Sequence, residues 1–111
     1  MKKKIYIAGC GGMLGEAFYN LFKDEYILKC TDININENWI SYLDFKNYKE
    51  YYKDVINFNP DYLFHLGAHT DLEFCENNKN ETYLTNTISV ENTTFIANDL
   101  NRWKMFANKI N

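Results

Sequence analysis

Three glycines near the amino terminus recur at intervals of three residues, a spacing suited to phosphate binding. Gly9, Gly12 and Gly15 stand between an apolar run typical of a strand and an apolar pattern typical of a helix. A tight turn at Gly9, a bare backbone at Gly12 and close helix packing at Gly15 would bring the first helical turn to a pyrophosphate. Free N–H groups and the helix dipole bind the anion there, so no lysine is required. A glycine-rich turn of purely structural role is the alternative.

Two aspartates supply candidate acceptors for the rest of a nucleotide. Asp32 closes the second predicted strand, where a carboxylate can accept both ribose hydroxyls of an adenosine. It would repel a 2′-phosphate and its neighbours are uncharged, which favours NAD over NADP. Asp44 follows Leu43 at the end of the third predicted strand, where it could accept the exocyclic amine of adenine. An ordinary turn or cap aspartate is the alternative at both positions.

The histidines and cysteines predict neither a metal site nor a disulfide framework. If one strand ran from His65 to His69, the two side chains would be separated by about 13 Å, too far to share an ion. Cys10, Cys30 and Cys75 are odd in number and lack framework spacing, which favours a reducing compartment. We therefore expect no metal and a cytoplasmic location.

Length and charge limit the domain count and the partners. The 111 residues, 46% of them hydrophobic, suffice for one packed domain and are too few for two. A formal net charge of −3 leaves no basic surface for nucleic acid or anionic lipid. The apolar runs are far shorter than the ~20 residues of a membrane span. We expect neither nucleic acid nor membrane as a partner.

The elements that must position these residues alternate between strand and helix. Strands are predicted over 4–8, 26–32, 39–43 and 62–68. Helices are predicted over 13–22 and from 48 to a stop at Asn59-Pro60, and a third follows a polar loop over 69–80. Their expected packed faces are Leu14, Ala17, Phe18, Leu21 and Phe22, then Tyr48, Tyr51, Tyr52, Val55 and Ile56, then Tyr83, Leu84, Ile88, Phe95 and Ile96.

This order of elements predicts an α/β fold with an incomplete, doubly wound, Rossmann-like parallel sheet. Right-handed crossovers place the strands in the order 3-2-1-4. The winding then reverses between the first and fourth strands. Ligands bind in the crevice at such a point, so the glycine turn and both aspartates are expected around it.

Taken together, the motifs resemble the extended short-chain dehydrogenase/reductase group. The resemblance rests on segment 8–15, Asp32, Leu43-Asp44 and segment 60–68. Segments 68–76 and 86–92 are similar to one branch, the dTDP-4-dehydrorhamnose reductases, which reduce a 4-keto nucleotide sugar. The resemblance covers residues 4 to about 100.

The resemblance implies an NAD(P)-dependent oxidoreductase that transfers hydride to a 4-keto nucleotide sugar, with NAD as cofactor and NADP as the alternative. It implies contacts from Gly67, Ala68 and Thr70 on the nicotinamide side, and support of the active-site end by Asn86. The full implied cofactor-binding set is Gly9, Gly12, Met13, Leu14, Gly15, Asp32, Leu43, Asp44, Gly67, Ala68, Thr70 and Asn86.

The sequence departs from this family at its carboxyl end. Family members continue with a fifth strand, a catalytic Ser or Thr and a Tyr-x-x-x-Lys helix, whereas here an NAD-binding half over 1–100 is followed by 101–111. We expect that tail to replace the fifth strand, as a helical extension or a frame-shifted end. Two Tyr-x-x-x-Lys matches, at Tyr19 and Tyr42, are expected at the wrong end of the dinucleotide.

Three expectations follow from this departure. The chain is the cofactor-binding part of a reductase, truncated before its catalytic residues and inactive alone. A non-catalytic NAD-binding module, or a fragment of a nucleotide-sugar epimerase or dehydratase, is the alternative. The fourth strand, 62–68, would be an exposed sheet edge, and we expect it to pair with another copy or a complementary chain.

Overall fold

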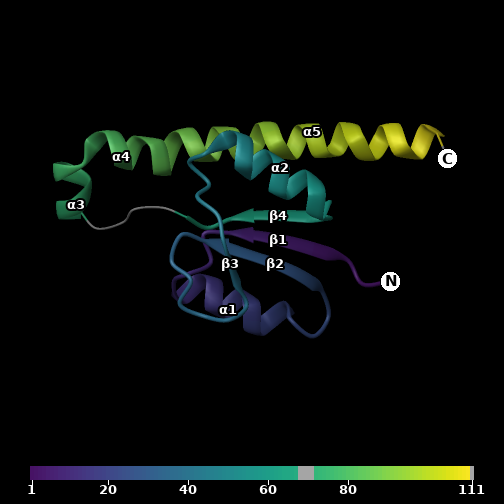
Figure 1. Cartoon of the computed structure of the whole chain (residues 1–111), viewed down its shortest axis with the longest axis horizontal. Helices are drawn as coiled ribbons and strands as arrows, with labels where there is room; N and C mark the ends of the chain where they lie inside the picture. The colour runs from purple at the N-terminus through teal and green to yellow at the C-terminus, as the bar shows by residue number, and fades with distance from the viewer. Residues whose placement is uncertain (68–71, 111) are drawn as a thin grey trace.

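Four parallel strands form one sheet in the order β3-β2-β1-β4 (Figure 1). The structure is a computed structural model, and it describes residues 1–67 and 72–110. The strands are β1 (Lys4–Ala8), β2 (Ile27–Asp32), β3 (Ile40–Tyr42) and β4 (Tyr62–His65). The expected fold class and strand order are therefore confirmed.

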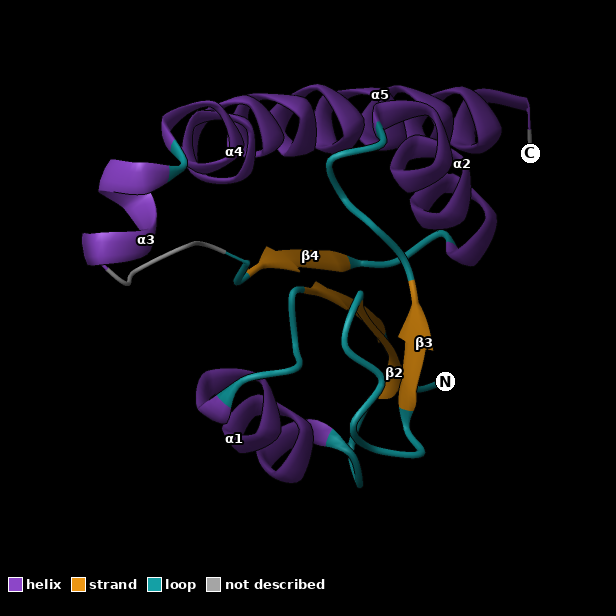
Figure 2. Ribbon diagram, turned by 60° about the vertical axis from the view of Figure 1, so that its left-hand side comes forward, coloured by secondary structure: helices purple, strands orange, loops and turns teal. Residues whose placement is uncertain are grey.

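Helices cover both faces of this sheet. They are α1 (Met13–Phe22), α2 (Tyr48–Phe58), α3 (Leu72–Asn77), α4 (Lys79–Tyr83) and α5 (Ser89–Ile110), with a π-helical turn, η1 (Leu84–Ile88), joining the last two. Figure 2 shows α1 on one face of the sheet and α2 with α5 on the other. None of the described helices is long and apolar enough to cross a membrane.

The packed face of α1 differs from the expected one. Leu14 and Leu21 are 56% and 68% exposed, and Ala17 is exposed as well. Phe18 and Phe22 do pack on the core beneath the sheet, as expected, together with Tyr19. The helix is rotated in this way because Gly15, which has no side chain, is its point of closest approach to the chain after β1.

The second helix matches its prediction closely. Tyr51 and Val55 are fully buried under the opposite face of the sheet, with Tyr52 and Ile56 packed beside them, whereas Tyr48 is 39% exposed. Asn59 ends the helix in the left-handed conformation, with φ 54°, directly before Pro60. A residue that precedes proline avoids the right-handed helical region, so the stop at this position follows from the sequence.

The expected face of the last helix is wrong at most positions. Tyr83, Leu84 and Phe95 are 56%, 44% and 60% exposed, whereas Thr85 and Ser89 are buried. Ile96 alone is buried as expected. The π-helical turn η1 interrupts the regular α-helical spacing on which this prediction was based. Ser89 stabilises that turn by donating its hydroxyl hydrogen to the carbonyl of Leu84 at 2.8 Å.

Two expected boundaries also need correction. β4 ends at His65, so the part of the predicted strand at 66–67 is irregular, and 68–71 lie outside the described residues. The predicted polar loop over 69–80 contains α3, a short helix closed by local hydrogen bonds such as Asn78 N–H to the Phe74 carbonyl. Residues 101–110 of the tail are helical, since α5 continues to Ile110.

Candidate functional site

A cavity of about 260 Å³ opens at the carboxyl ends of the strands, beside the boundary between β1 and β4 where the winding reverses. Loops after all four strands reach it, and so do α4 and η1. Small-molecule sites commonly have volumes of ~300–1,000 Å³, so this cavity suits a nucleoside-sized part of a larger ligand. Its lining residues are Gly9, Gly12, Asp32, Ile33, Asp44, Phe45, Lys46, Leu66, Gly67, Glu81 and Thr85.

The turn after β1 depends on Gly9. Its φ is +80°, a conformation that side chains rarely adopt, and a Cβ there would lie 2.3 Å from the backbone nitrogen of Gly67. The Gly9 N–H donates to the Thr31 carbonyl at 2.8 Å. The turn is thereby held between the ends of β2 and β4, which places it at the cavity.

Gly12 and Gly15 have different surroundings. No atom lies within 4 Å of the position that a Cβ of Gly12 would occupy, so this backbone borders open space. Gly12 is also the N-cap of α1, whose first-turn N–H groups are free of helical partners. A Cβ on Gly15 would lie 2.2 Å from the Cys10 carbonyl oxygen, so only glycine permits this packing of α1.

Asp32 is fixed at the end of β2 by backbone hydrogen bonds. Its Oδ2 accepts from Gly11 N–H at 2.9 Å, and its Oδ1 accepts from Asn34 N–H at 2.8 Å. A carboxylate offers about four acceptor positions, so both oxygens can still accept from a ligand hydroxyl. Asp32 is thus a preformed acceptor beside the glycine turn.

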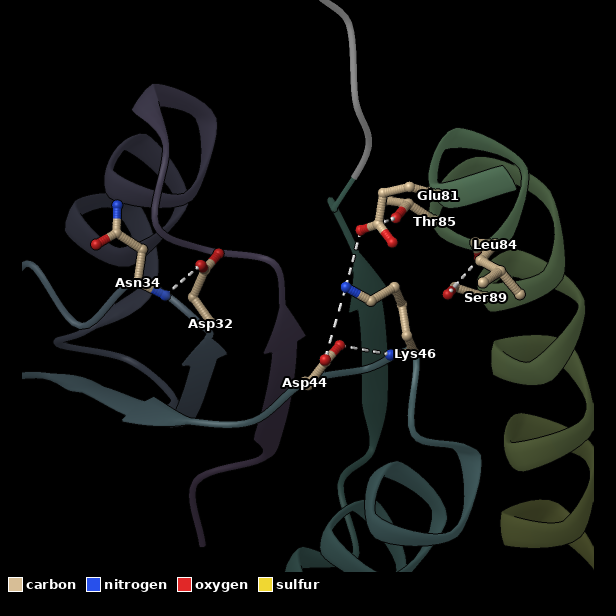
Figure 3. A network of polar contacts seen from close by, with 8 residues as sticks. All are labelled: Asp32, Asn34, Asp44, Lys46, Glu81, Leu84, Thr85 and Ser89. Carbon is tan, nitrogen blue, oxygen red and sulfur yellow. Dashed lines mark hydrogen bonds and ion pairs between the residues drawn. The ribbon is translucent and has the colours of Figure 1, made fainter. Parts of the chain in front are cut away.

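A charged cluster forms the opposite side of the cavity. The Lys46 ammonium lies 2.9 Å from Glu81 Oε1 and 3.6 Å from Asp44 Oδ2 (Figure 3). The hydrogen bond to Glu81 raises the pKa of Lys46 and thereby stabilises its charged form. Asp44 also accepts from the Lys46 N–H at 3.0 Å. This cluster joins the loop after β3 to α4.

An aromatic and polar layer supports the cavity from below. The ring of Phe45 packs edge-on against His65, with 4.5 Å between centroids. His65 Nδ1 contacts the hydroxyls of Tyr51 and Thr93 at 3.1 and 3.2 Å. Burial lowers the pKa of His65 and raises that of Tyr51 to about 12, so both are neutral near pH 7. A Cβ on Gly67 would strike Phe45 at 2.1 Å.

The structure brings together part of the predicted site. Gly9, Gly12, Asp32, Asp44 and Gly67 line the cavity. Met13 instead borders a separate hollow beside Trp39, Leu14 is exposed on α1, and Gly15 and Leu43 are buried in the packing. Asn86 lies in the π-helical turn η1. The predicted residues Ala68 and Thr70 lie outside the described residues.

Among the described residues that line the cavity, six were not foreseen from the sequence: Ile33, Phe45, Lys46, Leu66, Glu81 and Thr85. Ile33 and Leu66 directly follow β2 and β4, and Phe45 and Lys46 lie in the short segment after β3, so their places near strand ends were an available signal. Glu81 carried no such signal, because its approach to Lys46 depends on the packing of α4.

Neither Tyr-x-x-x-Lys match forms a tyrosine–lysine pair at the cavity. Tyr19 stacks on Trp39 beneath α1, with 4.0 Å between ring centroids. Tyr42 is 64% exposed and borders a hollow along α2, whereas Lys46 lies in the cavity with Glu81. Within the described part of the chain, no group of three or more His, Cys, Asp or Glu side chains could hold a metal ion.

Several solved structures share this fold. The dTDP-4-dehydrorhamnose reductase of Bacillus anthracis, in complex with NADP, is 24% identical over 91% of this chain, with a TM-score of 0.78. The L-threonine dehydrogenase of Clostridium difficile is 20% identical over 90%, with a TM-score of 0.80. The enzyme WbmH of Bordetella bronchiseptica, in complex with NAD+, is 17% identical over 91%, with a TM-score of 0.73. No protein-family profile and no curated protein matches the sequence.

These similarities establish the fold, and at that level they confirm the expected likeness to dTDP-4-dehydrorhamnose reductase. The chain corresponds to 34%, 34% and 36% of the three proteins, about a third of each.

Proposed function

We propose that the chain binds an adenine dinucleotide, with NAD preferred over NADP, as the cofactor-binding part of a nucleotide-sugar reductase that transfers hydride to a 4-keto sugar. The observation that supports this most is the cavity where the winding reverses, since it joins the glycine turn and both aspartates. Similar folds that hold NADP and NAD+ support the same ligand class. A cytoplasmic location is part of the proposal.

The proposed binding mode assigns each part of the ligand to a feature of the cavity. The pyrophosphate lies on the open backbone at Gly12 and the free N–H groups of α1. The adenosine ribose donates its hydroxyls to Asp32, whose carboxylate disfavours a 2′-phosphate. The adenine lies toward Asp44, and Gly67 leads to the nicotinamide side, where we propose contacts from Ala68, Thr70 and Asn86. NAD would supply the hydride-transferring nicotinamide, and the chain's residues would bind and orient it.

The proposed enzyme needs more than the described residues contain. They place no tyrosine–lysine pair at the cavity, so we propose that the 111-residue chain alone has no reductase activity.

We also propose that the free edge of β4, where Tyr62 is 43% exposed, pairs with a second copy or a complementary chain. Sedimentation velocity of the chain, alone and mixed with a candidate partner, measures this association.

A non-catalytic NAD-binding module is the second candidate, favoured by the same lack of a tyrosine–lysine pair. An epimerase or dehydratase part is a third, because an epimerase is among the proteins of similar fold. All three candidates require dinucleotide binding, so that property is tested first.

Titration calorimetry with NAD tests the binding itself. We expect wild-type binding, and a loss of at least tenfold in Gly12→Val, because the branched side chain occupies the space assigned to the phosphates. Gly12→Val should fold normally, since no protein atom lies within 4 Å of the added Cβ. Unchanged NAD affinity in this variant would contradict the assignment of the glycine turn, and no binding by the wild-type chain would contradict the proposed function.

A further inference from the structure

The charged cluster of Asp44, Lys46 and Glu81 contains more hydrogen-bond acceptors than donors. The side chains are 36%, 25% and 36% exposed, so all three are partly accessible from the cavity that they line. Two carboxylates flank one ammonium, which leaves an excess of one negative charge. Lys46 is engaged between its two partners. This side of the cavity therefore presents mainly acceptors to a ligand.

The cluster lies where the base of a bound nucleotide would be. Asp32 stands on one side of the view in Figure 3, Glu81 and Thr85 stand on the other, and Asp44 lies between them. If Asp32 binds the ribose and the glycine turn binds the phosphates, the base lies next to the remaining side of the cavity, which the charged cluster forms. Asp44 is the acceptor that the sequence predicts, and Glu81 is a second carboxylate that tertiary packing adds.

We propose that Glu81, positioned by Lys46, determines base specificity by selecting a purine with an exocyclic amine at position 6 over one with a carbonyl there. The inference rests on the proposed binding of an adenine dinucleotide. An amine donates N–H to a carboxylate, whereas a carbonyl oxygen would face it with two acceptors opposed. A carboxylate accepts about four hydrogen bonds, so one held by a lysine can also accept from a base.

Lys46 is a positioning residue in this arrangement. Glu81 and Asp44 carry like charges on separate elements, and Lys46 contacts both, at 2.9 and 3.6 Å. Thr85 adds a 3.5 Å contact to the same Glu81 oxygen, Oε1. Removing the ammonium would let the two carboxylates move apart, and Glu81 would no longer be held at the base.

The test compares NAD with nicotinamide hypoxanthine dinucleotide, which differs from NAD in carrying a carbonyl at position 6 of the purine and a hydrogen on the neighbouring N1. Calorimetry of the full chain should give about tenfold tighter binding of NAD. Glu81→Gln, which keeps the shape and adds an N–H donor, should reduce this ratio to about twofold. Lys46→Met should reduce the ratio as well, and Lys46→Arg should keep most of it because the positive charge is retained.

Glu50→Gln is the matched control, because Glu50 is an exposed glutamate of α2 outside the cavity. Its ratio should equal that of the wild type. If NAD binds but Glu81→Gln and Lys46→Met keep the wild-type ratio, the ion pair merely ties α4 to the loop after β3. The inference is then wrong while the proposed function stands. If the wild-type chain binds neither dinucleotide, both are wrong.

Discussion

The two sides of the cavity are built in different ways. The side with the glycine turn consists mainly of backbone, from Gly9 to the first turn of α1, within one short stretch of sequence. The other side consists of charged side chains, and the central pair, Lys46 and Glu81, is separated by 35 positions in the chain. One side is a local motif and the other is a product of tertiary packing.

This difference predicts how each side responds to substitution. At Gly9 and Gly15 the backbone lies against other backbone, which cannot move aside, so a methyl group added there strains the fold itself. The charged side chains lie at a partly open surface, where they rearrange and where water compensates for lost contacts. The glycine side should therefore show large effects on stability, and the charged side smaller effects on ligand choice.

Gly9→Ala should have the largest effect on the free energy of unfolding. A small effect would contradict the difference between the two sides of the cavity. The added Cβ meets the Gly67 nitrogen at 2.3 Å, at a φ of +80°, so we expect a loss of about 3 kcal/mol in the free energy of unfolding. Urea denaturation followed by circular dichroism measures it. Gly12→Ala is the control and should unfold near the wild-type midpoint, since open space surrounds that position. Equal midpoints for the two variants would contradict the role of Gly9.

Asp32→Ala should have an intermediate effect, and the effect should be on cofactor affinity. It removes the proposed ribose acceptor and also the partner of two backbone N–H groups. NAD affinity should fall about tenfold, and NADP affinity should fall less, because the repulsion of the 2′-phosphate is also removed. Parallel titrations with the two cofactors measure this. An equal loss for both would show that Asp32 does not contact the ribose.

The smallest effect is expected from lowering the pH. It concerns the stability contributed by His65, which packs against Phe45 beneath the cavity. Burial lowers the pKa of His65 in the folded chain, so the unfolded chain takes up its proton first. The contribution of neutral His65 to the free energy of unfolding is fully present above its pKa in the unfolded chain, about 6.5. It is lost as the pH falls below that value. The partners facing the ring, Tyr51, Thr93 and Phe45, carry no charge in this range.

His65→Gln tests this linkage because it keeps a polar group beside the Tyr51 and Thr93 hydroxyls and removes the titration. Urea midpoints at pH 7.5 and pH 5.5 should differ less in His65→Gln than in the wild type. The chain's second histidine is present in both proteins and cancels. The same fall in both proteins would assign the acid sensitivity to other groups.

The sequence by itself determined the features that depend on near neighbours. Alternating strand and helix patterns predicted the parallel sheet and its order, because crossovers are right-handed and connections are short. The spacing of Gly9 and Gly15 predicted the tight turn and the close helix. Asn59-Pro60 predicted the end of α2. In each case the physical cause lies within a few residues of its effect.

Only the tertiary structure decided which side chains face the sheet and which meet across the cavity. Gly15, rather than Leu14 or Leu21, sets the rotation of α1, because the helix approaches where no side chain intervenes. The π-helical turn before Ser89 interrupts the α-helical spacing on which the expected face of the last helix was based. Lys46 and Glu81 meet because that turn and the packing of α5 bring α4 over the loop after β3. Such contacts arise from the balance of the whole core, which no local pattern encodes.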